Sequence, residues 1–153
     1  MPANFAWAEG GLPDCVSRDR LETIECHMTG TCLFCTLGAG RIVLANEFAV
    51  VIRDNFPVSP GHTLILPKRH VVSFFDITGD ERQAMLALLD SAKLGLDAAF
   101  HPDAYNVGIN DGVAAGQTVP HLHLHLIPRY AGDREDPRGG VRWVLPQKAK
   151  YWP

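Results

Sequence analysis

Three histidines at every second position are the most distinctive chemical feature of the chain. His121, His123 and His125 lie in the stretch "HLHLHLIP", and a leucine follows each of them. Imidazole has a pKa of about 6.5, so it can act near neutral pH as a nucleophile, a proton carrier or a metal ligand. Alternate side chains of a β-strand share one face, so the pattern predicts three imidazoles on one face and three leucines on the core face.

A single metal ion held by all three histidines is disfavoured by geometry. Along a strand the backbones of His121 and His125 are about 13 Å apart, whereas zinc–nitrogen bonds are about 2.0–2.1 Å long. Two of the three imidazoles could still share an ion. The plain alternative is a row of exposed histidines without a chemical role, and the glycine-bearing loop before them argues against it.

That loop, residues 110–119 with the sequence "NDGVAAGQTV", has the composition of a phosphate-binding segment. Its glycines leave backbone N–H groups open to an anion, and Asn110, Gln117 and Thr118 add polar side chains. A plain hairpin turn would have a similar sequence. Next to the histidines, however, the loop favours attack of an imidazole on phosphorus, with a covalent phosphoramidate that water then opens. The loop donors would stabilise charge on the phosphoryl oxygens.

The second cluster of reactive side chains is the "CLFC" stretch, where Cys32 and Cys35 have the spacing of a metal or redox pair. Structural disulfides are unusual in the cytoplasm, where this chain is expected to reside. Three interpretations stay open from the residues alone: a metal site, a redox pair, or two unpaired thiols.

Composition sets the broad class of the protein. The 153 residues are enough for one domain with a sizeable core, and 46% apolar with 20% charged residues are typical of a soluble globular fold. Fourteen basic and 17 acidic residues give a net charge of −3, which argues against general binding to nucleic acid or to anionic membranes. No apolar run is long enough for a transmembrane helix. The N-terminus does not resemble a secretory signal, so we expect a cytoplasmic location.

Short β-rich stretches must position the histidines. Residues 41–54 indicate two strands around a turn, and residues 62–67, 105–110 and 121–128 each indicate one strand. These strands do not alternate regularly with helices. Their order favours an α+β domain with a mostly antiparallel sheet and packed helices.

Residues 77–100 form the clearest predicted helix. Thr78 and Glu81 have the spacing of a capping box at its start. Apolar residues repeat at helical spacing and are expected to face the core. They are Met85, Leu88, Leu89, Ala92, Leu96 and Ala99.

The sequence divides into three parts. Residues 1–30 are expected to be an N-terminal extension, with a short helix over residues 18–27, and residues 31–133 to be the domain that carries the histidines. Residues 134–153 are expected to be a C-terminal tail. The adjacent Lys68 and Arg69 side chains are expected to be solvated.

Three stretches together resemble the histidine-triad (HIT) family of hydrolases over roughly residues 31–133. They are "FPVSPGHTLILPKRHV", "HLHLHLI" and "NDGVAAGQTVPHLHLHLIPRYAGD", and the last is most similar to the fragile-histidine-triad branch and its bacterial relatives. The resemblance implies a five-stranded antiparallel sheet with two helices and a homodimer built through extended sheets. It also implies cleavage of a nucleoside 5′-monophosphate from a phosphoramidate or a dinucleoside polyphosphate, with magnesium accompanying polyphosphate substrates.

The resemblance implies that residues 31–133 are the catalytic domain and that the tail, residues 134–153, packs on this domain or on a dimer partner. It also assigns a role to individual residues. His123 would attack the α-phosphorus and form a nucleotidyl-histidine, and His125 would contact the phosphate and help the leaving group depart. Asp54 would bind the ribose, and His62 would either line the site or serve as a structural histidine. The residues that would hold the α-phosphate are Asn110, Gly116, Gln117, Thr118 and Val119.

The resemblance also implies a zinc site. Cys32 and Cys35 would bind the ion together with His70 of "PKRH" and His121. Two cysteines and two histidines form a closed tetrahedral set, so this zinc would be structural. The rival hypotheses for the whole protein are a non-enzymatic nucleotide-binding regulator and a zinc-binding interaction module.

Overall fold

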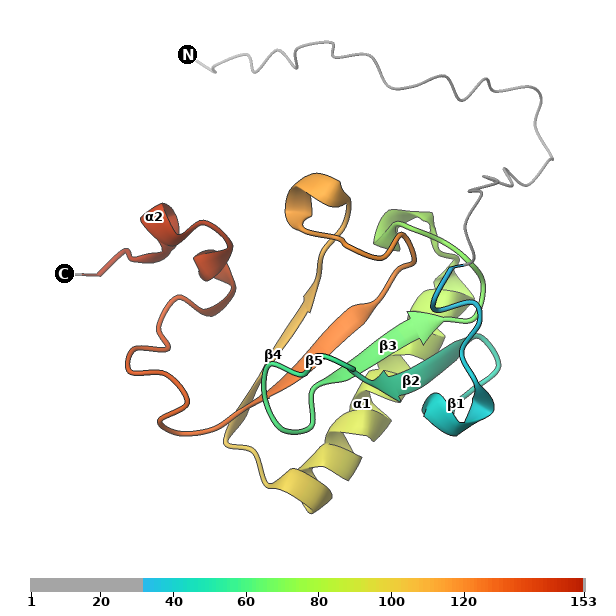
Figure 1. Ribbon diagram of the computed structural model, residues 1–153, viewed down its shortest axis with the longest axis horizontal. Helices are drawn as coiled ribbons and strands as arrows, with labels where there is room; N and C mark the ends of the chain where they lie inside the picture. Colours follow the sequence, from blue (N-terminus) through green and yellow to red (C-terminus); the bar gives the residue numbers. More distant parts are fainter. Residues whose placement is uncertain (1–31, 153) are drawn as a thin grey trace, which may run out of the picture.

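A five-stranded antiparallel sheet forms the body of the protein, which a computed structural model describes over residues 32–152 (Figure 1). The order across the sheet is β1-β2-β3-β5-β4, and every neighbouring pair is antiparallel. The α+β architecture expected from the sequence is therefore confirmed. The expected helix over residues 18–27, like the rest of the extension, lies outside the described residues. The strands are β1 (Ile42–Ala45), β2 (Ala49–Arg53), β3 (Thr63–Pro67), β4 (Ala104–Ile109) and β5 (Leu124–Arg129).

The long helix α1 (Gly79–Phe100) begins where the sequence predicted. The Thr78 side chain accepts a hydrogen bond from the Glu81 backbone, and the Glu81 carboxylate accepts one from the Thr78 backbone. This reciprocal pair satisfies two N–H groups that a helix start leaves free. Ala99 was wrongly expected in the core: it is exposed, because the last turn of α1 extends beyond the sheet (Figure 1).

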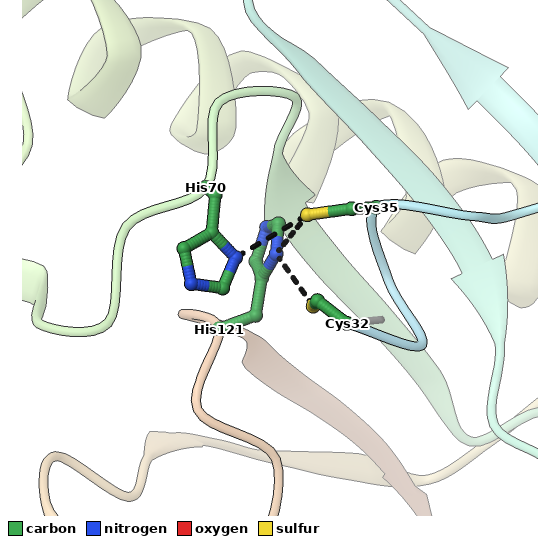
Figure 2. Close-up of side chains that lie close together, drawn as sticks. All are labelled: Cys32, Cys35, His70 and His121. Atoms are coloured by element: carbon green, nitrogen blue, oxygen red, sulfur yellow. Dashed lines mark hydrogen bonds between the residues drawn. The ribbon is translucent and has the colours of Figure 1, made fainter. Parts of the chain in front are cut away.

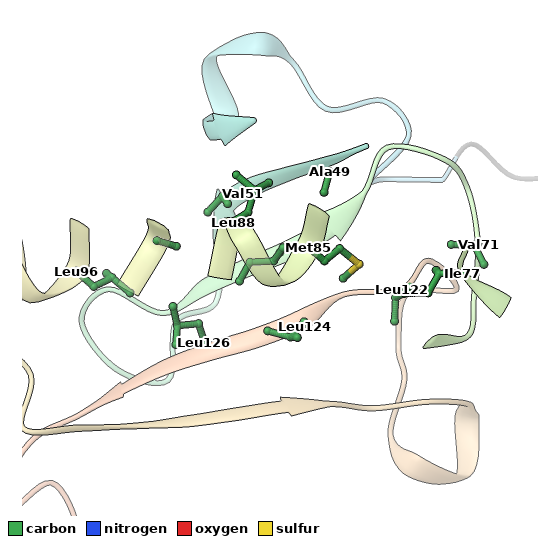
Figure 3. Packing of buried hydrophobic residues seen from close by; sticks show 12 residues of the cluster. Ala49, Val51, Val71, Ile77, Met85, Leu88, Leu96, Leu122, Leu124 and Leu126 are labelled. Atoms are coloured by element: carbon green, nitrogen blue, oxygen red, sulfur yellow. The ribbon is translucent and has the colours of Figure 1, made fainter. Parts of the chain in front are cut away.

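Helix α1 covers one face of the sheet, and the main hydrophobic core lies between them (Figure 3). Met85, Leu88 and Leu96 of the helix are buried against Leu124 and Leu126 of β5. The leucines that alternate with the histidines thus face the core, as the period of two predicted.

Arg69 is exposed, as expected, but it also pairs with the start of α1. Its Nε and Nη2 each donate to the Glu81 carboxylate over 2.8 Å. The Arg69 guanidinium holds the pKa of the Glu81 carboxyl down at about 2. Arg69 precedes His70, so this ion pair fixes the segment after β3 against the helix.

The opposite face of the sheet carries a second apolar cluster. Val50, Ile52, Leu64 and Leu66 are buried there, and Phe34 and Leu37 pack against them. The N-terminal segment that carries the two cysteines therefore covers the face away from α1. The same face presents His125, because Leu124 and Leu126 point into the core.

Strand β5 is shorter than predicted, since its ladder begins at Leu124 rather than at His121. The backbone before it bonds to loops instead: His121 N–H donates to Val119, and Leu122 N–H donates to Val71 over 2.6 Å. The extended alternation nevertheless continues, because Leu122 is also buried in the main core.

The segment after β5 folds into the 3₁₀ helix η4 (Gly140–Val144) and the short helix α2 (Pro146–Ala149). Arg142 donates to the carbonyls of Lys148 and Ala149, which ties these two helices together. Helix η4 also contacts β4. Within residues 32–152, no helix has the length and apolar character needed to cross a membrane.

Candidate active site and metal group

The position of the His123 proton follows from a single hydrogen bond. The Nδ1 atom lies 2.8 Å from the carbonyl oxygen of His121. A carbonyl can only accept, so Nδ1 carries the proton and Nε2 carries the free lone pair. His123 is only 6% exposed and lines a cavity of about 530 Å³. Its environment thus leaves one nucleophilic nitrogen available for a ligand.

His125 ends a chain of three side chains that starts at Asp54. Asp54 Oδ2 lies 3.3 Å from His62 Nδ1, and His62 Nε2 lies 3.0 Å from His125 Nδ1. The carboxylate accepts, so His62 Nδ1 carries a proton and His62 Nε2 accepts from His125. The Val58 N–H group also lies 3.4 Å from His62 Nδ1, but the negative charge of Asp54 favours the protonated nitrogen.

The outer nitrogen of His125 is the unsatisfied atom of this chain. Within residues 32–152, His125 Nε2 is buried without a hydrogen-bond partner, and such an atom costs about 1–3 kcal/mol unless a ligand or water bonds it. Burial, followed by the neighbouring His123 and His62, lowers the pKa of His125 to about 4. Burial also lowers the pKa of His62, although Asp54 opposes this effect. His125 is therefore neutral at pH 7, and its Nε2 presents a lone pair with no partner among the described residues.

The cavity has a polar end and an apolar end. His123, His125, Thr118 and Val119 line the polar end, and Asp54 lies at its side. Its volume is within the range of small-molecule sites, about 300–1,000 Å³. The apolar lining comes from Leu33, Phe34, Leu37, Ile52 and Leu64.

The loop before the histidines holds its shape through Gln117. This buried side chain accepts from the Gly112 N–H group over 2.8 Å and donates to the Val72 carbonyl over 2.9 Å. Gly116 has a φ of +90°, which favours glycine, and the Asn110 amide lies beside it. Neither Asn110, Gly116, Gln117 nor His62 lines the cavity, so their binding of the α-phosphate or substrate stays a prediction.

The four candidate metal ligands converge at the end of the sheet (Figure 2). Their ligand atoms all lie within 4.8 Å of one another. His121 Nδ1 is 3.4 Å from Cys32 Sγ and 3.5 Å from Cys35 Sγ, and His70 Nδ1 is 3.2 Å from Cys35 Sγ. Tetrahedral zinc with ordinary bond lengths separates sulfur and nitrogen ligands by about 3.5 Å. The group therefore has the dimensions of a zinc site.

Two further features suit these four residues to a cation. His121 Nε2 donates to the Pro67 carbonyl over 2.9 Å, which leaves the Nδ1 lone pair aimed at the sulfurs. Burial, together with the adjacent Cys32, raises the pKa of the Cys35 thiol to about 11. Two thiolates at this distance therefore need a positive ion to stabilise them.

The match to known families agrees with this geometry. The HIT domain family matches residues 39–132. The chain belongs to the HIT family. It is 39% identical to an uncharacterized HIT-like protein of Mycoplasma genitalium, over 70% of this chain and 79% of that protein. It is also 42% identical to the bis(5′-nucleosyl)-tetraphosphatase (asymmetrical) of Schizosaccharomyces pombe, over 50% of this chain and 42% of that enzyme.

Solved HIT structures share the fold. A zinc-bound histidine triad family protein from Mycobacterium smegmatis aligns with a TM-score of 0.62 and 32% identity, over 78% of this chain and 94% of that one. Some HIT proteins are thus nucleotide hydrolases, and at least one binds zinc.

Sequence reasoning for this HIT protein missed the chain from Asp54 through His62 to His125. A signal was present in the β2–β3 hairpin, where Arg53 pairs with Thr63. The next residues outward, Asp54 and His62, then face each other across the hairpin. It also missed the aromatic contact of Phe34 with His123, because that contact depends on how the N-terminal segment folds back over the sheet.

Proposed function

We propose that the protein is a nucleotide hydrolase that cleaves a nucleoside 5′-monophosphate from a phosphoramidate or a dinucleoside polyphosphate. The observation that carries the proposal is the fixed tautomer of His123, whose free Nε2 shares the cavity with the unsatisfied Nε2 of His125. Two such nitrogens at one phosphorus supply a nucleophile and a proton carrier. The match to a dinucleoside tetraphosphatase supports the substrate class.

The first step forms a covalent intermediate. A bound phosphate favours protonation of His125, because a nearby negative charge stabilises the imidazolium. His123 Nε2 then forms a bond to the α-phosphorus, and the bond from phosphorus to the leaving nitrogen or oxygen breaks. The leaving atom keeps the electron pair and takes the proton from His125. Asp54 stabilises the charged His125 through His62.

The second step releases the nucleotide. A water oxygen attacks the phosphorus, the bond to His123 Nε2 breaks, and the electron pair returns to that nitrogen. The water proton passes to His125. The loop would stabilise charge on the phosphoryl oxygens. Its donors would be the backbone N–H groups at Thr118 and Val119 and the side-chain amides of Asn110 and Gln117. Magnesium would accompany a polyphosphate as part of the substrate.

We infer a structural zinc ion at Cys32, Cys35, His70 and His121. The ion would fix the N-terminal segment to the backbone that carries His123. Chelation should release the metal and lower the thermal midpoint of unfolding, as metal analysis and calorimetry would show. A metal-replete preparation that contains no zinc would remove this part of the proposal. Cysteines that are kept reduced for metal binding fit a reducing compartment, so we propose a cytoplasmic location.

We also infer a homodimer through β4. This strand lies at the edge of the sheet and pairs only with β5 among the described strands, and Val107 on it is 43% exposed. An unpaired edge offers backbone groups to a second copy. Sedimentation equilibrium would test this assembly.

Substitution of His123 tests the chemistry. His123→Asn should retain binding of AMP but lose at least about a thousandfold in turnover of adenosine 5′-phosphoramidate, because the attacking nitrogen is gone. Mass spectrometry of the rapidly quenched wild type should detect a nucleotidyl-histidine. Unchanged turnover in His123→Asn would exclude this mechanism, whereas AMP binding without any turnover in the wild type would favour a regulatory nucleotide-binding protein.

A further inference from the structure

The sheet register fixes the direction in which a nucleotide would lie. His125 of β5 pairs with Leu64 of β3, Leu64 pairs with Ile52 of β2, and Ile52 pairs with Ile42 of β1. Neighbouring strands are about 4.8 Å apart, so this row spans about 14 Å across the sheet. That span is similar to the length of a purine nucleotide. With its phosphate at the histidines, a nucleotide would extend toward β1.

The apolar residues along this row form a place for the base. Ile52 and Leu64 line the cavity from the sheet, and Phe34 and Leu37 line it from the N-terminal segment. Asp54 follows β2, two residues after Ile52, and lines the same cavity, where it can accept hydrogen bonds from ribose hydroxyls. These surfaces suit any purine, so they do not discriminate between bases.

Arg41 adds a polar group that can discriminate between purine bases. It ends the 3₁₀ helix η1 (Ala39–Arg41) immediately before β1, and it lines the same cavity. Its Nη2 donates to the Arg53 carbonyl over 3.1 Å, which holds the guanidinium beside the β2 strand. Within residues 32–152, no salt bridge pairs Arg41 with a carboxylate. Its remaining N–H donors are therefore available to a ligand.

We propose that Arg41 reads the base and makes the site selective for guanosine and inosine 5′-phosphoryl compounds over their adenosine counterparts. The proposal rests on the nucleotide hydrolase function above. A guanidinium has donors only. Guanine and hypoxanthine present two adjacent acceptors, O6 and N7, which match this fork, whereas adenine replaces O6 with an amino donor. An adenine base in the same position would oppose one donor with another.

Equilibrium binding of GMP, IMP and AMP to the full chain tests this assignment by calorimetry. The wild type should bind GMP and IMP about tenfold more tightly than AMP, which is the discrimination expected of one bidentate contact. Arg41→Met should weaken GMP and IMP to the AMP level and leave AMP unchanged. Arg41→Lys should retain part of the preference, since it keeps one charged donor. Arg82→Met removes an exposed arginine of α1 and should bind like the wild type.

The outcomes separate this inference from the proposed function. Equal affinities of the wild type for GMP, IMP and AMP would overturn the role of Arg41, and so would a preference for GMP and IMP that survives in Arg41→Met. If the wild type still turned over nucleotide substrates, the hydrolase proposal would stand. If IMP bound as weakly as AMP, a bidentate contact of Arg41 with O6 and N7 of the base would be excluded. If the wild type bound none of the three nucleotides, both proposals would be overturned. The wild-type panel and Arg41→Lys decide the question even if Arg41→Met unfolds.

Discussion

The Phe34 ring lies edge-on to the imidazole of His123, with ring centroids 5.4 Å apart and an angle of 73° between the planes. The same ring is 5.8 Å from the centroid of His121. Phe34 lies between Cys32 and Cys35 in the chain, so the turn that carries two candidate metal ligands also contacts the candidate nucleophile. A shift of the candidate metal ligands would therefore move the Phe34 ring and change the environment of His123 in the cavity.

Phe34→Leu should separate metal binding from catalysis. The four candidate metal ligands are unchanged, so the variant should bind as much zinc as the wild type, but loss of the edge contact should lower kcat/KM by about tenfold. An aromatic pair is worth about 0.5–1.5 kcal/mol beyond its buried area. Metal analysis and steady-state kinetics check both parts. Phe75→Leu, which changes a ring that is 79% exposed, is the matched control. Kinetics equal to the wild type would show that Phe34 does not support His123.

The depressed pKa of His125 predicts how stability depends on pH. The folded-state pKa is about 4, below the unfolded value of about 6.5. Between these values the unfolded chain binds a proton that the folded chain does not, so stability falls as pH decreases from about 6.5 toward 4. Thermal unfolding across this window should show a shallower decline for His125→Gln than for the wild type. The exposed His101→Asn should decline as the wild type does, and equal slopes for all three proteins would contradict the prediction.

Asp54→Asn should lower kcat by about 10- to 100-fold, because His62 would lose the carboxylate that fixes its tautomer. Asp54 Oδ1 also accepts from the Phe56 N–H group over 2.9 Å, so the loop conformation should tolerate the isosteric amide. Turnover should be compared for ribose and 2′-deoxyribose substrates. An effect on KM alone, confined to the ribose substrate, would restrict Asp54 to sugar binding. Asp90→Asn on the exposed surface of α1 is the control.

Leu126→Ala should lower the free energy of unfolding by about 2–5 kcal/mol, the usual range for a buried leucine. Leu126 is 1% exposed and belongs to the core against α1. Leu94 on the same helix is 70% exposed, so Leu94→Ala should change stability by no more than about 0.5 kcal/mol. Urea unfolding measures both values. Similar losses for the two variants would contradict the core assignment of β5.

The sequence predicted those features that depend on local spacing. The capping box follows from the spacing of three residues between Thr78 and Glu81. The inward leucines of β5 follow from the period of two residues along a strand. The cysteine pair and His121 also came together as the family resemblance implied.

Features that depend on distant contacts could not be predicted in the same way. Nothing near Arg69 in the chain indicates that its partner is Glu81, twelve residues away at a helix start. The ladder of β5 begins late because Leu122 N–H donates to Val71, a contact that only the tertiary fold creates. Tautomers of His123 and His125 likewise depend on which acceptors the fold brings to each ring.

Glu81 links two segments that would otherwise open independently. The same carboxylate accepts from the Thr78 backbone and from Arg69, one residue before His70. Fraying of the first turn of α1 would release Arg69, and displacement of Arg69 would leave the helix start less well capped. The two segments should therefore open and close as one cooperative unit. We therefore expect the affinity of the proposed zinc site, which includes His70, to be coupled to the local stability of a helix that contributes no ligand to it.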